Sequence, residues 1–350
     1  MTNHGQNIDM MPTPIAATTP RPQSEAGMSI VVPVFNEGVG LAQFHAQLVG
    51  VVRQLRQQRG LATEVIYVDD GSRDDSLAVA NTLPAEALDI QVVSLSRNFG
   101  KEAALLAGLD HARFGAVLFM DGDGQHPPAL IDTLVQHWQE GYDVVYTAKQ
   151  HRENESALRR LGGRMFYSLL NWGSRHKIPE DAGDFRLLSP RAADALRRMP
   201  ERNRFFKGLA SWIGFKQLRV DYEPAERAYG KTTFGWGSLL LLSVEGITSF
   251  SVAPLRLASL LGVLMAAIAL IFGAQILFEV LFYGIAVPGY PSVVVGLMVL
   301  GGVQLVMIGV LGEYIGKILS ELKARPIYFV AEHSVKNAEP QSDAARAAAE

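Results

Sequence analysis

Short apolar runs alternate with amphipathic stretches along the chain from Met28 onward. The apolar runs are four to six residues long and rich in β-branched side chains, which is typical of buried strands. The stretches between them carry apolar residues at helical spacing. The predicted strands are 29–34, 64–68, 90–95, 116–120 and 144–147, and the predicted helices are 41–59, 76–83, 102–113 and 128–140. This alternation predicts a doubly wound, mostly parallel α/β sheet with a ligand crevice at its strand ends.

Polar side chains gather directly after the first four predicted strands. They are Asn36 and Glu37, then Asp69 and Asp70, then Arg97 to Glu102, and then Asp121 and Asp123. The carboxyl ends of parallel strands meet at one edge of a sheet, where open α/β sheets bind ligands. Four successive loops with acids and amides exceed what turn chemistry requires. Neither Gly-x-Gly-x-x-Gly nor a P-loop pattern occurs at these turns, which disfavours dinucleotide and P-loop sites.

The fourth strand ends in two carboxylates one residue apart, Asp121 and Asp123. Such a pair repels itself unless a cation lies between or beside the two groups. A hard divalent cation that shares its oxygen ligands with substrate phosphates meets this requirement. The alternative is a Gly-rich turn that uses Asp for local hydrogen bonds, and the pair alone does not decide between the two.

Residues 151–235 have a more irregular pattern and many arginines and lysines. Many of these cations are expected on solvated helix faces. The segment 181–188 lies among them, interrupts helical periodicity, and holds two acids, an aromatic residue and an arginine. We expect Asp184 and Arg186 in this segment to belong to the site, and the alternative is a charged loop.

The chain becomes strongly apolar toward its C-terminus. Residues 257–278 and 293–311 contain at most two polar residues each, and each segment is long enough to span a bilayer as a helix. Two buried core helices are a poor alternative, because nothing else in the chain is large enough to bury both. Residues 237–250 are apolar on most faces, which predicts a helix that lies at a membrane surface.

Positive residues flank the two spans on one side only. Arg256 precedes the first span, Lys317, Lys323 and Arg325 follow the second, and the connection 282–292 has no lysine or arginine. By the positive-inside rule both termini face the cytoplasm. The predicted division is a disordered leader (1–27), an α/β catalytic domain (28–235), an interfacial helix (236–252), two membrane helices within 253–320 (about 257–280 and 292–312) and a cytoplasmic tail (321–350).

Composition narrows the classes of function further. The 350 residues carry a formal net charge of -3, which argues against nucleic acid as a partner. The sequence has no cysteine, so disulfides, thiolate nucleophiles and Cys-ligated zinc are excluded. The leader shows no apolar signal region, so we expect the α/β domain to stay in the cytoplasm.

Five segments taken together resemble glycosyltransferase family 2, which has the GT-A fold. They are Val-Pro-Val-Phe-Asn36-Glu37, Val-Asp69-Asp70-Gly-Ser, Ser-Arg97-Asn-Phe-Gly-Lys101-Glu-Ala-Ala, Asp121-Gly-Asp123-Gly-Gln125-His-Pro-Pro and Asp184-Phe-Arg186-Leu. Pro254-Leu-Arg256 and Arg325-Pro-Ile-Tyr328 extend the resemblance over residues 28–330, to polyprenyl-phosphate glycosyltransferases such as bactoprenol glucosyltransferases and dolichyl-phosphate mannose synthases. The resemblance implies inverting transfer of one sugar from a nucleotide diphosphate sugar to polyprenyl phosphate, such as undecaprenyl phosphate, at the cytoplasmic face of the cell inner membrane.

The resemblance also implies roles for residues on the donor side. Asp123 and Gln125 would approach a divalent metal, Mg²⁺ or Mn²⁺, and Asp121 would contact the metal or the ribose. The nucleotide would lie against Pro33, Asn36, Glu37, Asp69, Asp70 and Gly122, with Arg97 and Lys101 supporting that wall. A purely structural role for Lys101 stays open. The chain has Gly122, Gly124 and His126 where the family often has Ala, Leu and Asp.

On the acceptor side the resemblance implies that Asp184 orients the acceptor or accepts charge from it. A phosphate oxyanion is already nucleophilic at neutral pH, so the need for a general base is low. Arg186 and Arg204 are the candidates to bind phosphate, because guanidinium groups match phosphate oxygens. Arg227 and Lys231 would meet the lipid phosphate, or else attract anionic head groups.

Several alternatives stay open. UDP-glucose is the first expectation for the donor, with GDP-mannose, UDP-galactose and UDP-linked amino sugars behind it. A processive polysaccharide synthase would need more spans and a Gln-x-x-Arg-Trp motif, which the sequence lacks. A nucleotide-binding scaffold without turnover and a two-span channel subunit are the rivals that are not enzymes. Small residues in the spans make a homo-oligomer plausible, and the resemblance implies a downstream flippase or transferase.

Overall fold

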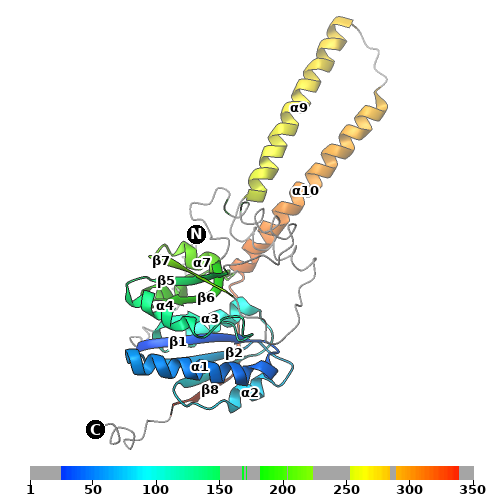
Figure 1. Ribbon diagram of the computed structural model, residues 1–350. Coiled ribbons are helices and arrows are strands. Elements are labelled where there is room, and N and C mark those ends of the chain that lie inside the picture. The colour runs from blue at the N-terminus through cyan, green and yellow to red at the C-terminus, as the bar shows by residue number, and fades with distance from the viewer. Residues whose placement is uncertain are drawn as a thin grey trace, which may run out of the picture.

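The computed structural model describes residues 25–149, 168, 171, 182–202, 204–223, 253–283 and 289–338. These residues form an α/β unit around an eight-stranded sheet, with two long helices that extend away from it (Figure 1). The strands are β1 (Glu25–Val34), β2 (Thr63–Asp69), β3 (Asp89–Leu95), β4 (Phe114–Phe119), β5 (Val144–Lys149), β6 (Ala182–Leu188), β7 (Gln217–Tyr222) and β8 (Val330–Lys336). Their order in the sheet is β7-β5-β6-β4-β1-β2-β3-β8.

Helices cover both faces of the sheet. They are α1 (Gly38–Arg59), α2 (Ser76–Thr82), α3 (Lys101–His111), α4 (Leu130–Gln139), α6 (Pro190–Arg197) and α7 (Phe206–Trp212). The first core joins α1, α2 and α4 to one face through residues such as Leu48 and Ile131. The second core joins α3, α6 and α7 to the other face through residues such as Leu106 and Leu196. The predicted doubly wound architecture is therefore confirmed.

The strand pairing brings the carboxyl ends of β1 to β4 to one edge of the sheet. Of the seven pairings among the described residues, four are parallel, so the sheet is mixed. β6 lies antiparallel between β4 and β5. The interrupted periodicity at 181–188 therefore marks a strand and not a charged loop, since Phe185, Leu187 and Leu188 are fully buried in the sheet.

The chain returns to the sheet after the second long helix, so the predicted cytoplasmic tail (321–350) contains a strand of the sheet, β8. β8 pairs antiparallel with β3 at the edge of the sheet, and the main-chain N–H of Ser96 donates to Phe329 O (2.9 Å). His333 Nε2 lies 2.9 Å from Gln91 Oε1. β8 is mostly exposed, so its sequence lacks the apolar run that identifies a buried strand.

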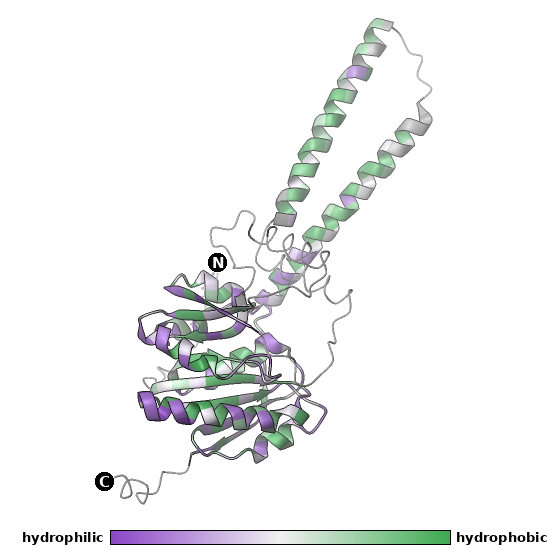
Figure 2. Cartoon of the chain, in the orientation of Figure 1, coloured by the Kyte–Doolittle hydropathy of each residue, from purple (hydrophilic) through white to green (hydrophobic). Residues whose placement is uncertain are grey.

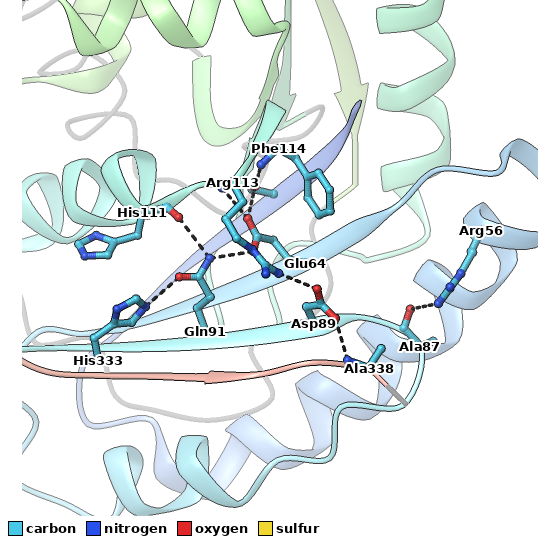
Figure 3. A network of polar contacts seen from close by, with 11 residues as sticks. Arg56, Glu64, Ala87, Asp89, Gln91, His111, Arg113, Phe114, His333 and Ala338 are labelled. Carbon is cyan, nitrogen blue, oxygen red and sulfur yellow. Dashed lines mark hydrogen bonds and ion pairs between the residues drawn. The ribbon is translucent and has the colours of Figure 1, made fainter. Parts of the chain in front are cut away.

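A buried carboxylate anchors this side of the sheet (Figure 3). Glu64 is fully buried, and its two oxygens accept hydrogen bonds from Ser29 Oγ (2.6 Å), Gln91 Nε2 (2.7 Å), Arg113 N (2.8 Å) and Arg113 Nε (2.7 Å). Arg113 also donates to Asp89 Oδ2 (2.6 Å). Because Gln91 in turn contacts His333 of β8, the network links four strands, β1, β2, β3 and β8, to the loop before β4.

Replacement of Glu64 by alanine is expected to destabilise the protein by about 3–5 kcal/mol, because it leaves a guanidinium and an amide without their shared acceptor. The control is Glu86→Ala, which removes an exposed ion pair with Arg53 and should change stability by at most about 1 kcal/mol. Chemical denaturation measures both values. Equal values for the two variants would contradict the assigned role of the network.

The two long helices are α9 (Ala253–Tyr283) and α10 (Tyr290–Leu322). Their segments Leu257–Ile276 and Gly296–Leu322 are long and apolar enough to cross a membrane, and 0% of each is buried inside the structure. Figure 2 shows hydrophobic residues along both helices, outside the α/β unit. They are therefore not core helices of that unit. The predicted leader and the predicted interfacial helix lie outside the described residues, except that β1 begins at Glu25.

The end of α10 is attached to the α/β unit. The carboxylate of Glu321 accepts from the main-chain N–H of Arg202 at 2.9 Å and 3.1 Å, and Arg202 Nε donates to Arg325 O (3.0 Å). Further on, the hydroxyl of Tyr328 donates to Asp110 Oδ2 (2.9 Å). The contacts of Glu321 and Arg325 hold the end of α10 against the loop between α6 and α7.

Candidate active site

The antiparallel pairing of β4 and β6 brings two acids together at the edge of the sheet. Phe119 of β4 pairs with Arg186 of β6. Continuing that register by two residues places Asp121, which follows β4, opposite Asp184, which lies near the start of β6. The sequence predicted both residues in the site, and the structure shows that one sheet edge presents them.

Lys101, the first residue of α3, bridges these two carboxylates. Its Nζ lies 2.6 Å from Asp121 Oδ1 and 2.7 Å from Asp184 Oδ2, and Nζ of Lys207 on α7 lies 3.4 Å from Asp184 Oδ1. Burial alone would raise the pKa of the Asp184 carboxyl, but Lys101 and Lys207 hold it well below its usual range. Burial opposes the charge of Lys101, yet Asp184 and Asp121 raise its pKa. Asp184 is thus a stable carboxylate and a poor proton acceptor.

The turn after β4 is shaped by its own polar groups. Asp123 Oδ1 accepts from the main-chain N–H of Gln125 (3.0 Å), and Gly124 has φ 78, a left-handed conformation that glycine adopts without strain. The N–H of Asp121 donates to His126 Nδ1 (3.1 Å), so the neutral ring carries its proton on Nε2. The His126 ring stacks on Phe185, with centroids 5.1 Å apart. The turn is therefore stabilised by its own hydrogen bonds, and it also carries the two acids that the sequence predicted for a metal site.

The donor atoms of the turn suit a metal that arrives with its substrate. Asp121, Asp123 and Gln125 offer only oxygen ligands, which hard divalent cations prefer. Among the described residues no three His, Asp or Glu side chains are grouped as a metal site. Mg²⁺ commonly binds through one or two carboxylates and completes its coordination with substrate phosphates. The three residues fit a metal–diphosphate complex better than a metal held by the protein alone.

The two acids at the end of β2, Asp69 and Asp70, accept hydrogen bonds from other groups of the protein. Asp69 accepts from the main-chain N–H of Ser72 and from Ser94 Oγ, both at 3.1 Å. Asp70 accepts from the main-chain N–H groups of Phe99 (2.7 Å) and Gly100 (2.9 Å), and burial raises its pKa despite these bonds. Asp69 therefore ties the turn after β2 to β3, and Asp70 ties it to the loop after β3, so both shape the predicted nucleotide wall from behind.

The loop after β1 lies against the Asp121 turn. Asn36 has φ 56, and its Oδ1 accepts from the main-chain N–H of Arg73 (2.8 Å). A Cβ at Gly122 would lie 2.9 Å from Glu37 Oε2, so the Glu37 carboxylate packs directly against this glycine. Pro33 is partly buried in β1. The structure thus brings Glu37 and Gly122 together, as the predicted donor site requires.

The predicted arginines have different surroundings. Arg97 is exposed, with its guanidinium 4.0 Å from the centre of the Phe99 ring. Arg186 is 2% exposed, and it donates to Gly183 O (2.7 Å). Arg204 donates to three main-chain carbonyls, and burial lowers its pKa. Arg186 and Arg204 therefore bind main-chain carbonyls, which disfavours their predicted contacts with phosphate. Arg227 and Lys231, predicted to meet the lipid phosphate, lie outside the described residues.

The structure adds four residues that the sequence did not predict for the site. Lys207 contacts Asp184, and His126 supports the turn. Burial raises the pKa of Glu102 and of Tyr222, and the charge of Asp184 adds to the effect on both. Glu102 and His126 lie within segments quoted for the family resemblance but had no predicted role, whereas Lys207 and Tyr222 reach the site only through tertiary packing.

Glu102 gives the site a dependence of stability on pH. Burial and the Asp184 charge outweigh the bond from the Phe206 N–H and raise the Glu102 pKa to about 7. The unfolded chain ionises near its ordinary value, about 4.3. The folded state therefore binds more protons between these values, so stability is highest below this window and is lost as pH rises toward 7.

Glu102→Gln is expected to remove this pH dependence, because the amide oxygen still accepts from Phe206 N but does not titrate. Relative to this variant, the wild-type protein should lose up to about 3 kcal/mol between pH 4.5 and 7.5. Thermal unfolding over that range measures the difference. Parallel curves for the two proteins would show that Glu102 is not the titrating group.

Comparison with known proteins assigns the class. Residues 29–197 match the model of the family named Glycosyl transferase family 2. Together with the full-length relatives described next, this match shows that the chain belongs to glycosyl transferase family 2. It is therefore a glycosyltransferase.

The relatives match most of the chain. The chain is 42% identical over 303 residues to a prophage bactoprenol glucosyl transferase homolog of Escherichia coli, covering 87% of this chain and 98% of that protein. It is 39% identical over 305 residues to an uncharacterized glycosyltransferase of Synechocystis sp., covering 87% and 95% of the two chains. A solved mannosyl-3-phosphoglycerate synthase from Rubrobacter xylanophilus aligns with TM-score 0.43 at 18% identity, over 68% of this chain and 75% of that one, and this likeness carries no inference.

Proposed function

We propose that the protein transfers one sugar from a nucleotide diphosphate sugar to polyprenyl phosphate, with inversion at the anomeric carbon. UDP-glucose is the first candidate for the donor. A lipid phosphate oxygen forms the new bond to the anomeric carbon while the bond from that carbon to the diphosphate breaks. The nucleoside diphosphate leaves with the bonding electrons.

The Lys101 bridge between Asp121 and Asp184 is the observation that carries the proposal. One ammonium group contacts Asp121 after β4, the proposed donor-side acid, and Asp184 on β6, the proposed acceptor-side acid. A transferase needs its leaving group and its nucleophile in adjacent positions. This arrangement of residues favours group transfer between two phosphate-bearing substrates. It is less expected in a scaffold that only binds a nucleotide.

Each residue of the site then has a physical task. A bound divalent cation would stabilise charge on the leaving diphosphate as a Lewis acid. Asp123 and Gln125 would hold that cation, with Asp121 beside them. Asp184 stays ionised and holds Lys101 and Lys207 at the acceptor side, where their ammonium groups attract the lipid phosphate. The nucleophile is already an anion, so no residue has to remove a proton from it.

The proposed location is the cytoplasmic face of the cell inner membrane. The unburied apolar segments of α9 and α10 support membrane insertion. The placement of lysines and arginines around them supports a cytoplasmic α/β unit. The base of α10 is bonded to the loop before α7, so the membrane helices would hold Lys207 near the bilayer surface, where a lipid phosphate is found.

The test uses the purified full chain in detergent with undecaprenyl phosphate, Mg²⁺ or Mn²⁺, and a panel of labelled sugar nucleotides. Label from one donor should enter the organic phase. A water-soluble labelled polymer would favour the processive synthase. Absence of transfer with every donor would refute the proposal and favour the nucleotide-binding scaffold.

A further inference from the structure

Tyr222 ends β7 at the same edge of the sheet as Asp121. β7 is parallel to β5, and Tyr222 pairs in register with Lys149. Two antiparallel pairings separate β5 from β4, so β5 and β7 run in the direction of β4. The carboxyl end of β7 therefore opens toward the site, and the Tyr222 ring meets the His126 ring edge-on, with centroids 6.2 Å apart.

The hydroxyl of Tyr222 has no hydrogen-bond partner among the described residues, although the side chain is buried. The residue is 4% exposed, and its hydroxyl oxygen is inaccessible to solvent. A buried polar group without a partner destabilises a protein, so an atom of this kind calls for a ligand or another explanation.

The surroundings of the hydroxyl define what such a ligand must offer. Burial raises the pKa of Tyr222 to about 12, and the charges of Asp121, Asp123 and Asp184 add to this effect. The hydroxyl is thus a protonated donor within the field of the three site carboxylates. The two ammonium groups described there already have carboxylate partners: Lys101 lies between Asp121 and Asp184, and Lys207 contacts Asp184.

We propose that the Tyr222 hydroxyl donates a hydrogen bond to a diphosphate oxygen of the bound nucleotide sugar. The inference rests on the proposed function, because the diphosphate is the acceptor-rich group that a metal on Asp123 would bring to this edge. Carboxylates cannot donate to phosphate oxygens, so a neutral donor beside them offsets their repulsion of the diphosphate. Tyr222 is then a donor-binding residue of the transferase.

Tyr222→Phe tests the inference, because it keeps the ring against His126 and removes only the hydroxyl. The affinities of UDP, GDP, ADP and dTDP, and of the matching sugar nucleotides, are measured by calorimetry on the full chain in detergent with Mn²⁺. For the nucleotide that the wild-type protein binds, the variant should bind about tenfold more weakly. The loss should be the same for the diphosphate and its sugar nucleotide.

The thermal stability of the unliganded variant separates binding from a structural role. Its Tm should equal or exceed that of the wild-type protein, because an unpaired buried hydroxyl is removed. Tyr142→Phe is the matched control, since the Tyr142 ring packs against Lys216 away from the acids, and nucleotide affinity should not change.

Three results would overturn the inference while leaving the proposed function intact. They are unchanged diphosphate affinity in Tyr222→Phe, a loss confined to the sugar nucleotide, and a lower Tm of the unliganded variant. If the wild-type protein binds none of the four nucleoside diphosphates, the proposed function fails and this inference fails with it.

Discussion

Asp123→Asn is expected to lower the rate of sugar transfer about a thousandfold, a loss of ~4 kcal/mol of transition-state stabilisation. The amide oxygen can still accept from Gln125 N, as Asp123 Oδ1 does at 3.0 Å, so the turn should keep its shape. What disappears is the negative charge that would hold a divalent cation on the leaving diphosphate. Initial rates over a range of Mn²⁺ concentrations measure the effect.

The matched control for this variant is Asp75→Asn. Asp75 is exposed at the start of α2, and its side chain makes no capping hydrogen bond. The rate should stay within about twofold of wild type, since exposed substitutions of this kind are nearly neutral. A loss of less than tenfold for Asp123→Asn, at any metal concentration, would remove Asp123 from the proposed metal site.

Asp184→Asn is expected to lower the rate about a hundredfold or more, a range typical of losing one electrostatic group from an active site. A neutral amide cannot balance Lys101 and Lys207, so both ammonium groups would lose the partner that positions them. Because the pKa of Asp184 is held well below its usual range, the carboxylate should act by its charge at every working pH. Between pH 6 and 9, the pH–rate profiles of the wild-type protein and of Asp184→Asn should therefore have the same shape.

Rates from pH 6 to 9 for the wild-type protein and for Asp184→Asn test this assignment. Asp194→Asn is the control, because its partner is Arg197 on the same helix and the pair is exposed on the Asp194 side. It should leave the rate unchanged. An inflection near neutral pH that is present in the wild type and absent from Asp184→Asn would instead identify Asp184 as a general base.

The sequence predicted the strands before residue 150 because each contains a short apolar run that is mostly buried. It also predicted which acids share an edge, since the carboxyl ends of parallel strands meet there. Asp121, Asp123 and Glu37 follow from this rule alone. The predicted family is confirmed as well, because residues 29–197 match the model of Glycosyl transferase family 2 and relatives of 39–42% identity cover most of the chain.

The sequence did not predict the antiparallel strands or the tertiary ion pairs. β6 is seven residues long and carries charges, and β8 is an exposed edge strand, so neither has the pattern of a buried strand. Arg186 was assigned to phosphate from residue type, whereas burial in the sheet directs it to main-chain carbonyls. Lys207 reaches Asp184 only through the packing of α7, which no local pattern specifies.

The proposed site transfers a single sugar from a nucleotide sugar to a lipid phosphate and releases the nucleoside diphosphate. The most direct measurement is mass spectrometry of the organic phase after the full chain acts on undecaprenyl phosphate and UDP-glucose, with other sugar nucleotides in parallel. The account predicts that one donor yields undecaprenyl phosphate carrying a single sugar, and that a metal chelator prevents its formation. Unmodified undecaprenyl phosphate with every donor, or lipid carrying a polymer, would contradict it.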